Sequence, residues 1–162
     1  MNKSFQLCAL ALLGMVLAAG CAHYPPMPYT ISIVPNTPNT VPVDLVGVTK
    51  EQCQELMGMN VDDFWLPDNG FRKTADIFPV QVSGGKATPP GLAVQDPTWQ
   101  RWLGNNVSNL VFFADLRGEG FKGLGKLDPR RISIDLTARY VSNTIVVEIQ
   151  DKSVRVVTPF KR

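Results

Sequence analysis

The feature that most constrains the fold is a series of short strand-like segments that turn residues keep apart. Each segment is rich in Val, Ile, Thr, Phe or Tyr, and Gly, Pro, Asn, Asp or Ser residues bound it. In the segment 131–140, Ile132 and Ile134 alternate with polar residues, which predicts a strand with one buried face. Several short strands in one domain predict an all-β fold, a small antiparallel β-sandwich. The predicted strands are residues 29–34, 41–48, 77–82, 107–115, 131–140, 144–150 and 154–158.

Two tight-turn sequences join the last three of these segments. Ser142 and Asn143 form the first turn, and Asp151 begins the second. Such residues favour β-turns between antiparallel neighbours. We therefore expect residues 131–158 to form an antiparallel meander.

Two stretches carry helix signals instead. Thr49 and Gln52 have the spacing of a capping box, in which each side chain bonds the backbone N–H of the other residue. Asp96 followed by Pro97 is a second helix start, because Asp is a good N-cap and Pro suits the first turn. The sandwich is expected to carry these one or two short helices.

The second helix would place Trp99 and Trp102 on one face, since residues three apart are neighbours on a helix. We interpret the pair as a plug that closes one end of the sandwich. The alternative is an exposed platform for sugar rings, which would make the protein a periplasmic glycan-binding module.

The N-terminus has the features of a bacterial lipoprotein signal. Lys3 precedes an apolar stretch at residues 5–16, and small residues then lead directly into Cys21. In such a lipobox the cysteine is lipidated and becomes the new N-terminus. We predict a signal peptide at residues 1–20 and a lipid on Cys21, and the alternative is an ordinary signal with a chance cysteine.

The residues after Cys21 predict where the domain lies. Ala22 is not the aspartate that favours retention in the inner membrane, so the expected location is the outer membrane. Residues 21–29 are rich in proline and predict an extended tether. Residues 30–162 would then form one periplasmic domain, in which no segment approaches the roughly 20 apolar residues of a membrane span.

Charge and histidine content argue against several kinds of function. The formal net charge of +2 argues against a nucleic-acid partner. The one histidine, His23, lies in the tether, so the domain cannot assemble a Ser-His-Asp triad or a histidine metal cluster. Asp62 and Asp63 fit solvated or capping roles better than a catalytic pair. We expect no catalytic residue, no metal and no cofactor.

The cysteines leave no internal disulfide. Cys8 is removed with the signal and Cys21 carries the lipid, so Cys53 has no partner in the chain. We expect Cys53 to be a small buried residue. The alternative is a thiol nucleophile in a minor enzyme.

A glycine-rich stretch imitates a phosphate-binding motif. Residues 118–123 fit G-x-G-x-x-G, and residues 120–126 fit the first seven positions of a P-loop. Both motifs need a following helix whose N-terminal amides face the phosphate. Here Leu127 replaces the hydroxyl residue that would bind magnesium, and a strand-like segment follows. We predict a hairpin loop that binds no nucleotide.

Four segments of the chain form one further pattern. They are ISIV at 31–34, VPVDLVGV at 41–48, VDDFWLPDN at 61–69 and NLVFFADLR at 109–117. Together they resemble the TssJ lipoproteins of type VI secretion systems. In that family a strand, a proline-bearing loop and a second strand precede an acidic-aromatic segment, and a later apolar strand ends in an alanine and a basic residue. The final hairpin, residues 132–157, is similar to the closing strands of the family.

Three features depart from the family pattern. The loop 35–40 is short and lacks the Asn-Pro-Asp and Gly-Arg-Pro sequences of the family, and Asp44 is acidic where a basic residue is common. Residues 118–126 are glycine-rich where the family has a compact turn. The alternative is therefore a different envelope lipoprotein on a similar sandwich.

The resemblance implies a transthyretin-like β-sandwich, anchored in the outer membrane and facing the periplasm. It implies a non-catalytic role in assembly, through binding of the periplasmic part of a TssM-like inner-membrane protein. It also places the partner-contacting element in the loop between the first two strands, although an ordinary connecting turn is the alternative. The residues concerned are Pro35, Asn36, Thr37, Pro38, Asn39 and Thr40.

Overall fold

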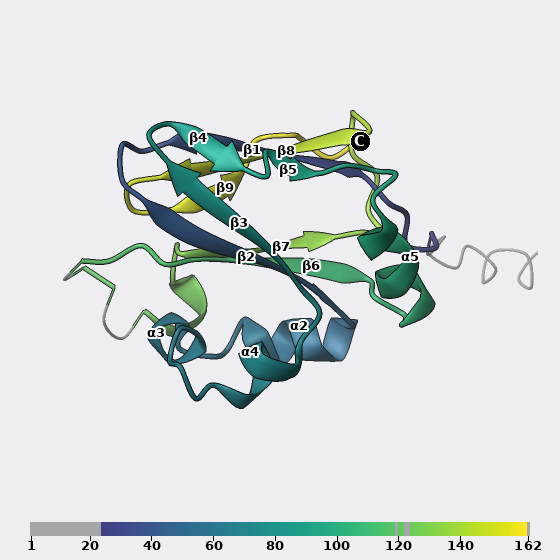
Figure 1. The fold of residues 1–162 in the computed structure, drawn as a ribbon. Coiled ribbons are helices and arrows are strands. Elements are labelled where there is room, and N and C mark those ends of the chain that lie inside the picture. The colour runs from purple at the N-terminus through teal and green to yellow at the C-terminus, as the bar shows by residue number, and fades with distance from the viewer. Residues whose placement is uncertain (1–23, 119, 122–123, 162) are drawn as a thin grey trace, which may run out of the picture.

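The computed structural model describes residues 24–118, 120–121 and 124–161, which form a sandwich of two β-sheets with helices outside it (Figure 1). The predicted β-sandwich is confirmed. The smaller sheet has the order β5 (Gly91–Leu92), β1 (Thr30–Asn36), β8 (Thr144–Gln150), β9 (Val154–Val156). The larger sheet has the order β4 (Lys86–Thr88), β3 (Ile77–Ser83), β2 (Val41–Val48), β6 (Asn109–Ala114), β7 (Arg131–Asp135).

One strand pair departs from the antiparallel pattern. β1 and β8 run parallel along the whole of both strands, from Thr30 opposite Thr144 to Asn36 opposite Gln150. The other pairs in both sheets are antiparallel. Parallel neighbours need a long connection between them, and here most of the chain lies between the two strands.

The predicted meander is wrong. β7 pairs with β6 in the larger sheet, whereas β8 and β9 form a hairpin in the smaller one. The carboxylate of Asp135 accepts hydrogen bonds from the backbone N–H of Thr137 at 2.8 Å and from its hydroxyl at 2.6 Å. This Asx-type turn ends β7 and lets the chain cross to the other sheet.

The main core lies between the sheets. Its members come from the inward faces of both sheets and are almost free of solvent, as expected for alternating strands. Among them are Ile31, Leu45, Phe112, Ile145 and Ile149. The larger sheet also buries the part of its outer face that β2 and β6 form.

A second core covers the outer face of β2 and β6. Helices α2 (Lys50–Leu56), α3 (Val61–Phe64) and α4 (Gly70–Thr74) lie against this face (Figure 1). The rings of Phe64 and Phe113 stack there with centroids 3.8 Å apart. Because both faces are covered, β2 and β6 are buried on each side.

The charge of Asp44 is accommodated in this outer layer. Its carboxylate accepts a 2.7 Å hydrogen bond from Nε of Arg72, and only 5% of the Asp44 side chain is exposed. The Arg72 guanidinium also lies 4.7 Å from the centroid of the Trp65 ring. An acidic residue in this strand is therefore paired across the helical layer.

The two predicted helices are confirmed. Thr49 and Gln52 form the complete capping box at the start of α2. The Asp96 side chain caps α5 (Pro97–Gly104) by accepting the backbone N–H of Thr98 at 2.8 Å. Helices α3 and α4 were not expected, and Asn60 and Asn69 cap them in the same way.

Trp99 and Trp102 are buried, which confirms the plug. Their rings meet edge to face with centroids 5.6 Å apart, and they are 2% and 1% exposed. A sugar platform needs open ring faces, so that interpretation is wrong.

In the part of the chain that the structure describes, no helix has the length and apolar composition of a membrane span.

We predict that Gly47→Ala destabilises the fold. A Cβ at this position would lie 2.5 Å from Cδ2 of the buried Trp102 ring. Overpacking of this kind costs about 1–3 kcal/mol of unfolding free energy, which urea denaturation would measure. Gly70→Ala is the matched control, since nothing lies within 4 Å of its added Cβ and alanine favours the helix. Equal stability of the two variants would contradict the packing described.

Candidate functional site

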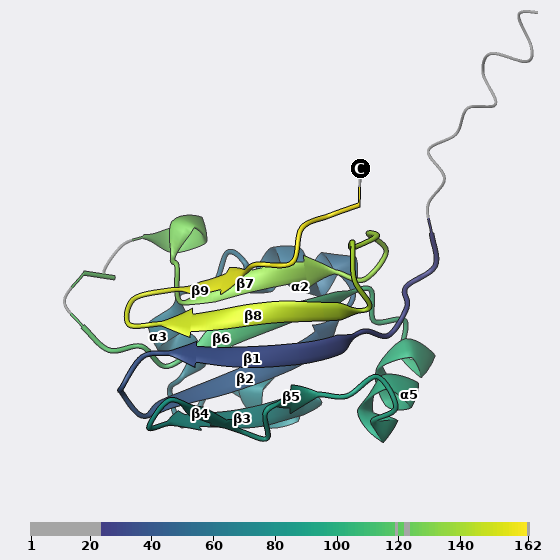
Figure 2. The same cartoon turned by 90° about the horizontal axis from the view of Figure 1, so that it is seen from above.

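Three connections gather at one end of the sandwich. They are residues 37–40 between β1 and β2, the described residues of the 115–130 connection between β6 and β7, and residues 151–153 between β8 and β9. Figures 1 and 2 both show them opposite the end where the described chain begins at residue 24. We call these three connections the loop end.

The strand β1 joins the two ends directly. It starts at Thr30, close after the tether, and its seven residues end at Asn36, beside the loop end. At about 3.3 Å per residue the strand covers roughly 23 Å. The first residues after the tether thus lead straight to the opposite end of the domain.

Two of the predicted contact residues do not belong to the loop. Pro35 and Asn36 are the last residues of β1, where they pair with Ile149 and Gln150 of β8. The strand extends because pairing with β8 continues to its last residue. The loop proper is therefore residues 37–40.

Thr37 has a structural role that the sequence did not indicate. It is 5% exposed, and its hydroxyl donates a 2.6 Å hydrogen bond to Oδ1 of Asp151 in the β8–β9 turn. The hydroxyl oxygen of Thr37 in turn accepts a hydrogen bond from the backbone N–H of Asn39 at 3.2 Å. Thr37 therefore ties two connections of the loop end together, and it is buried although the resemblance places it in the partner-contacting loop.

Four of the other predicted contact residues are exposed. They are Asn36, Pro38, Asn39 and Thr40. Beside them lie two hollows, one of about 550 Å³ and one of about 650 Å³, which both reach Asn39, Arg117 and Asp151. Arginine and aspartate side chains at the edges of these hollows suit polar contacts with another surface.

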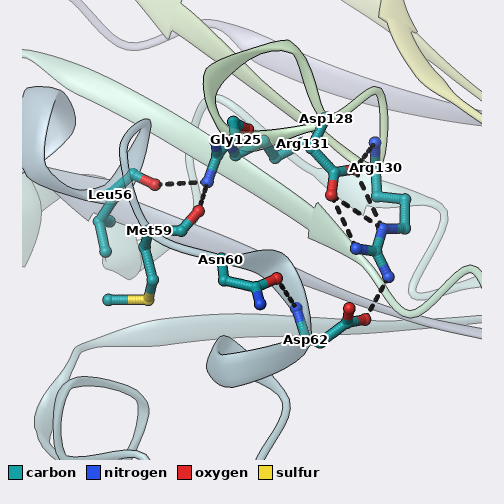
Figure 3. A network of polar contacts seen from close by, with 8 residues as sticks. All are labelled: Leu56, Met59, Asn60, Asp62, Gly125, Asp128, Arg130 and Arg131. Carbon is teal, nitrogen blue, oxygen red and sulfur yellow. Dashed lines mark hydrogen bonds and ion pairs between the residues drawn. The ribbon is translucent and has the colours of Figure 1, made fainter. Parts of the chain in front are cut away.

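A buried arginine holds the base of the 115–130 connection. The Arg130 guanidinium donates to both carboxylate oxygens of Asp128, with Nε to Oδ1 at 3.0 Å and Nη2 to Oδ2 at 2.7 Å. Its Nη1 also donates to Asp62 at the start of α3, as Figure 3 shows. Both Arg130 and Asp128 are about 5% exposed. The pair is bidentate, which is the strong form of this interaction.

The neighbouring Arg131 makes a second connection to the helical layer. Its guanidinium donates to the carbonyls of Leu56, at 2.9 Å, and Met59, and thus satisfies groups at the end of α2. It also donates to the carbonyl of Gly125 (Figure 3). Arg130 and Arg131 together join the loop end to the helices.

The buried position of Asp128 beside Arg130 shifts the pKa of its carboxyl group. Burial opposes its ionisation, but the hydrogen bonds from the Arg130 guanidinium and backbone outweigh burial and hold the pKa of Asp128 below its usual range. A lowered folded-state pKa stabilises the fold above the unfolded pKa of about 3.9. That contribution is lost as the pH falls through the folded-state pKa.

We predict that Asp128→Asn destabilises the protein at pH 7 by about 3 kcal/mol, because it leaves the buried Arg130 with only the exposed Asp62 as a charge partner. Urea unfolding at pH 7 would measure the loss of unfolding free energy. Between pH 7 and pH 3, the unfolding free energy of the variant should fall by less than that of the original protein. Asp63→Asn is the control, since Asp63 is exposed on α3. A similar effect in both variants would contradict the role of the buried pair.

The glycine-rich connection is a hairpin link, as predicted. It joins β6 to β7, which pair antiparallel. A short 3-10 turn, η1 (Gly125–Leu127), precedes β7, so a strand stands where a P-loop needs its helix. Residues 119, 122 and 123 lie outside the described residues.

Cys53 is buried, as expected. It is 7% exposed in α2, and burial raises the pKa of its thiol. A raised pKa disfavours the thiolate that a nucleophile needs.

The signal peptide, Cys21, Ala22 and His23 lie outside the described residues. Among the residues that are described, no group of three or more His, Cys, Asp or Glu side chains is placed to hold a metal.

Sequence comparison finds nothing similar, because no family model and no curated protein matches the chain. Structure comparison does. The T6SS lipoprotein TssJ1 from Pseudomonas aeruginosa matches with a TM-score of 0.51 and 12% identity, over 85% of this chain and 100% of that one. Lip from Serratia marcescens, a membrane-bound component of the type VI secretion system, matches with a TM-score of 0.53 and 10% identity, over 84% of this chain and 99% of that one.

The chain has the fold of the TssJ-type lipoproteins. A structure of the C-terminal domain of the T6SS protein TssM from EAEC also matches, with a TM-score of 0.54 and 11% identity, over 80% of this chain and 99% of that one. The resemblance inferred from the sequence is confirmed at the level of fold. At 10 to 12% identity the likeness is one of architecture.

Proposed function

We propose that this chain is a lipoprotein of the outer membrane that faces the periplasm and assembles a type VI secretion trans-envelope complex without catalysis. The observation that carries the proposal is the opposed placement of the tether and the loop end (Figure 2). A lipid on Cys21 would hold one end at the membrane. The TssJ-type fold supports the same function.

The proposed partner is the periplasmic domain of a TssM-like inner-membrane protein. It would contact the exposed residues Asn36, Pro38, Asn39 and Thr40 at the loop end, while Thr37 holds the loop in place. The ties from Thr37 to Asp151 and from Arg130 to the helices support this surface, because a preorganised loop loses little entropy on binding. Function would rest on affinity and geometry.

We predict that Cys21→Ser abolishes membrane attachment, because it removes the thiol that carries the lipid. Palmitate labelling and membrane fractionation of cells would measure this. Cys53→Ser is the matched control and should leave acylation intact, since Cys53 is buried in the domain. Acylated, membrane-attached Cys21→Ser protein would contradict the lipobox.

We predict that the triple variant Asn36→Ala, Asn39→Ala, Thr40→Ala binds the TssM periplasmic domain of the same organism more than tenfold more weakly, a loss of about 1.4 kcal/mol. Biolayer interferometry would measure the affinity. Exposed positions support no core, so the unfolding free energy should change by less than about 0.5 kcal/mol.

Two further variants accompany this experiment, one as a control for affinity and one as a test of the hydrogen bond that holds the loop. Asn143→Ala changes an exposed asparagine at the tether end and should leave affinity unchanged. Thr37→Val removes the hydrogen bond to Asp151 and should lower the unfolding free energy by about 1–3 kcal/mol. Unchanged affinity in the triple variant would reject the contact surface and leave the fold assignment untouched.

A further inference from the structure

The end of the sandwich next to the tether carries an exposed patch of aromatic, aliphatic and basic side chains. Tyr24, Val141 and Phe160 are 49%, 58% and 60% exposed, although they are large and apolar. Arg139 and Lys161 lie among them. We call these five residues the anchor-end patch.

Contacts between three segments make the patch continuous. The Arg139 guanidinium lies 4.2 Å from the centroid of the Tyr24 ring, and the Arg139 carbonyl accepts the backbone N–H of Lys161 at 2.7 Å. The Phe160 ring packs on Tyr140 with centroids 4.8 Å apart. Figure 2 shows the start of the described chain and its last residues at the same end of the molecule.

The tether that leads to this patch is short. The backbone N–H of Met27 donates to the Leu136 carbonyl at 3.2 Å, and Tyr29 is 2% exposed, with its hydroxyl donating to the Ala138 carbonyl at 2.9 Å. The domain therefore binds the tether well before residue 30. Three residue steps remain between Cys21 and Tyr24, which span at most about 11 Å.

That length sets the distance between the domain and the membrane. The headgroup region of a bilayer is about 5–7 Å thick on each side, by the difference between the full bilayer and its hydrocarbon core. With a lipid on Cys21, Tyr24 would lie in or just above this layer. The exposed side chains around it share that position.

The chemistry of the patch suits a lipid headgroup layer. Aromatic side chains favour the membrane interface, and lysine and arginine attract anionic headgroups. The patch contains no carboxylate, and the nearby Asp135 carboxylate is engaged by Thr137. The acidic Asp76 on the same end of the molecule is paired with Arg101 of α5.

We propose that the anchor-end patch rests on the surface of an anionic bilayer and fixes the orientation of the domain on it. The inference depends on the lipid anchor of the proposed function, but it involves no protein partner. With the patch on the membrane, the loop end faces away from it.

A fluorescent probe at the patch tests this inference. The acylated full chain, with Cys53→Ser and Val141→Cys, is labelled with a polarity-sensitive fluorophore and placed in vesicles of phosphatidylethanolamine and phosphatidylglycerol. We expect brominated lipids to quench the probe at least twofold. The control carries Leu127→Cys, which is 85% exposed in η1 at the other end, and should not be quenched. Equal quenching at both positions would overturn the proposal.

One double variant of the patch and one change of lipid sharpen the test. Phe160→Ser with Lys161→Glu should reduce the quenching at position 141 to that of the control, while vesicle flotation and circular dichroism stay unchanged. Replacing phosphatidylglycerol by phosphatidylcholine should weaken the quenching in the original patch at least twofold.

Other results would count against the inference in distinct ways. A blue-shifted probe that brominated lipids do not quench would mean that a second copy covers the patch. Protein that fails to float with vesicles would contradict the predicted lipid anchor on Cys21, and the proposal that depends on it. Because no TssM protein is present, neither result bears on the loop-end contacts.

Discussion

The structure depends on the burial of both faces of the central strand pair, β2 and β6. One face contributes Leu45 and Phe112 to the core between the sheets, and the other contributes Val46 and Phe113 to the layer beneath α2, α3 and α4. A sheet covered on both sides has no wet face, so its strands read as nearly continuous apolar runs. The helices are therefore part of the fold and keep the outer face of β2 and β6 dry.

Two consecutive arginines connect this helical layer to the loop end. Arg130 pairs with Asp128 and Asp62, and Arg131 satisfies carbonyls at the end of α2. A buried arginine is costly unless acceptors satisfy its N–H groups. Arg130 meets the carboxylates of Asp128 and Asp62, and Arg131 meets three backbone carbonyls, although Nε of Arg131 has no hydrogen-bond partner among the described residues. The loop end is thus held by directional contacts as well as by packing, which suits a surface that must keep its shape.

Local signals in the sequence predicted local structure well. The capping box of Thr49, the Asp96 cap and the buried pair of tryptophans are all present, because each depends on residues a few positions apart. The alternation of apolar and polar residues predicted where strands lie and which of their faces is buried. It could not predict which strands pair, because a buried face does not identify the sheet to which a strand belongs. The parallel pairing of β1 with β8 was missed for that reason. Thr37 was misjudged because its partner, Asp151, is 114 residues away.

The position of β1 has a mechanical consequence. The strand lies between β5 and β8 and runs from the tether to the loop end. Tension between an anchor at one end and a partner at the other would act along its axis. Its hydrogen bonds to β8 lie across that axis, so the load reaches them in shear and they must fail together. A strand pulled from its edge would instead open one bond at a time, and β1 avoids this by crossing the domain from end to end.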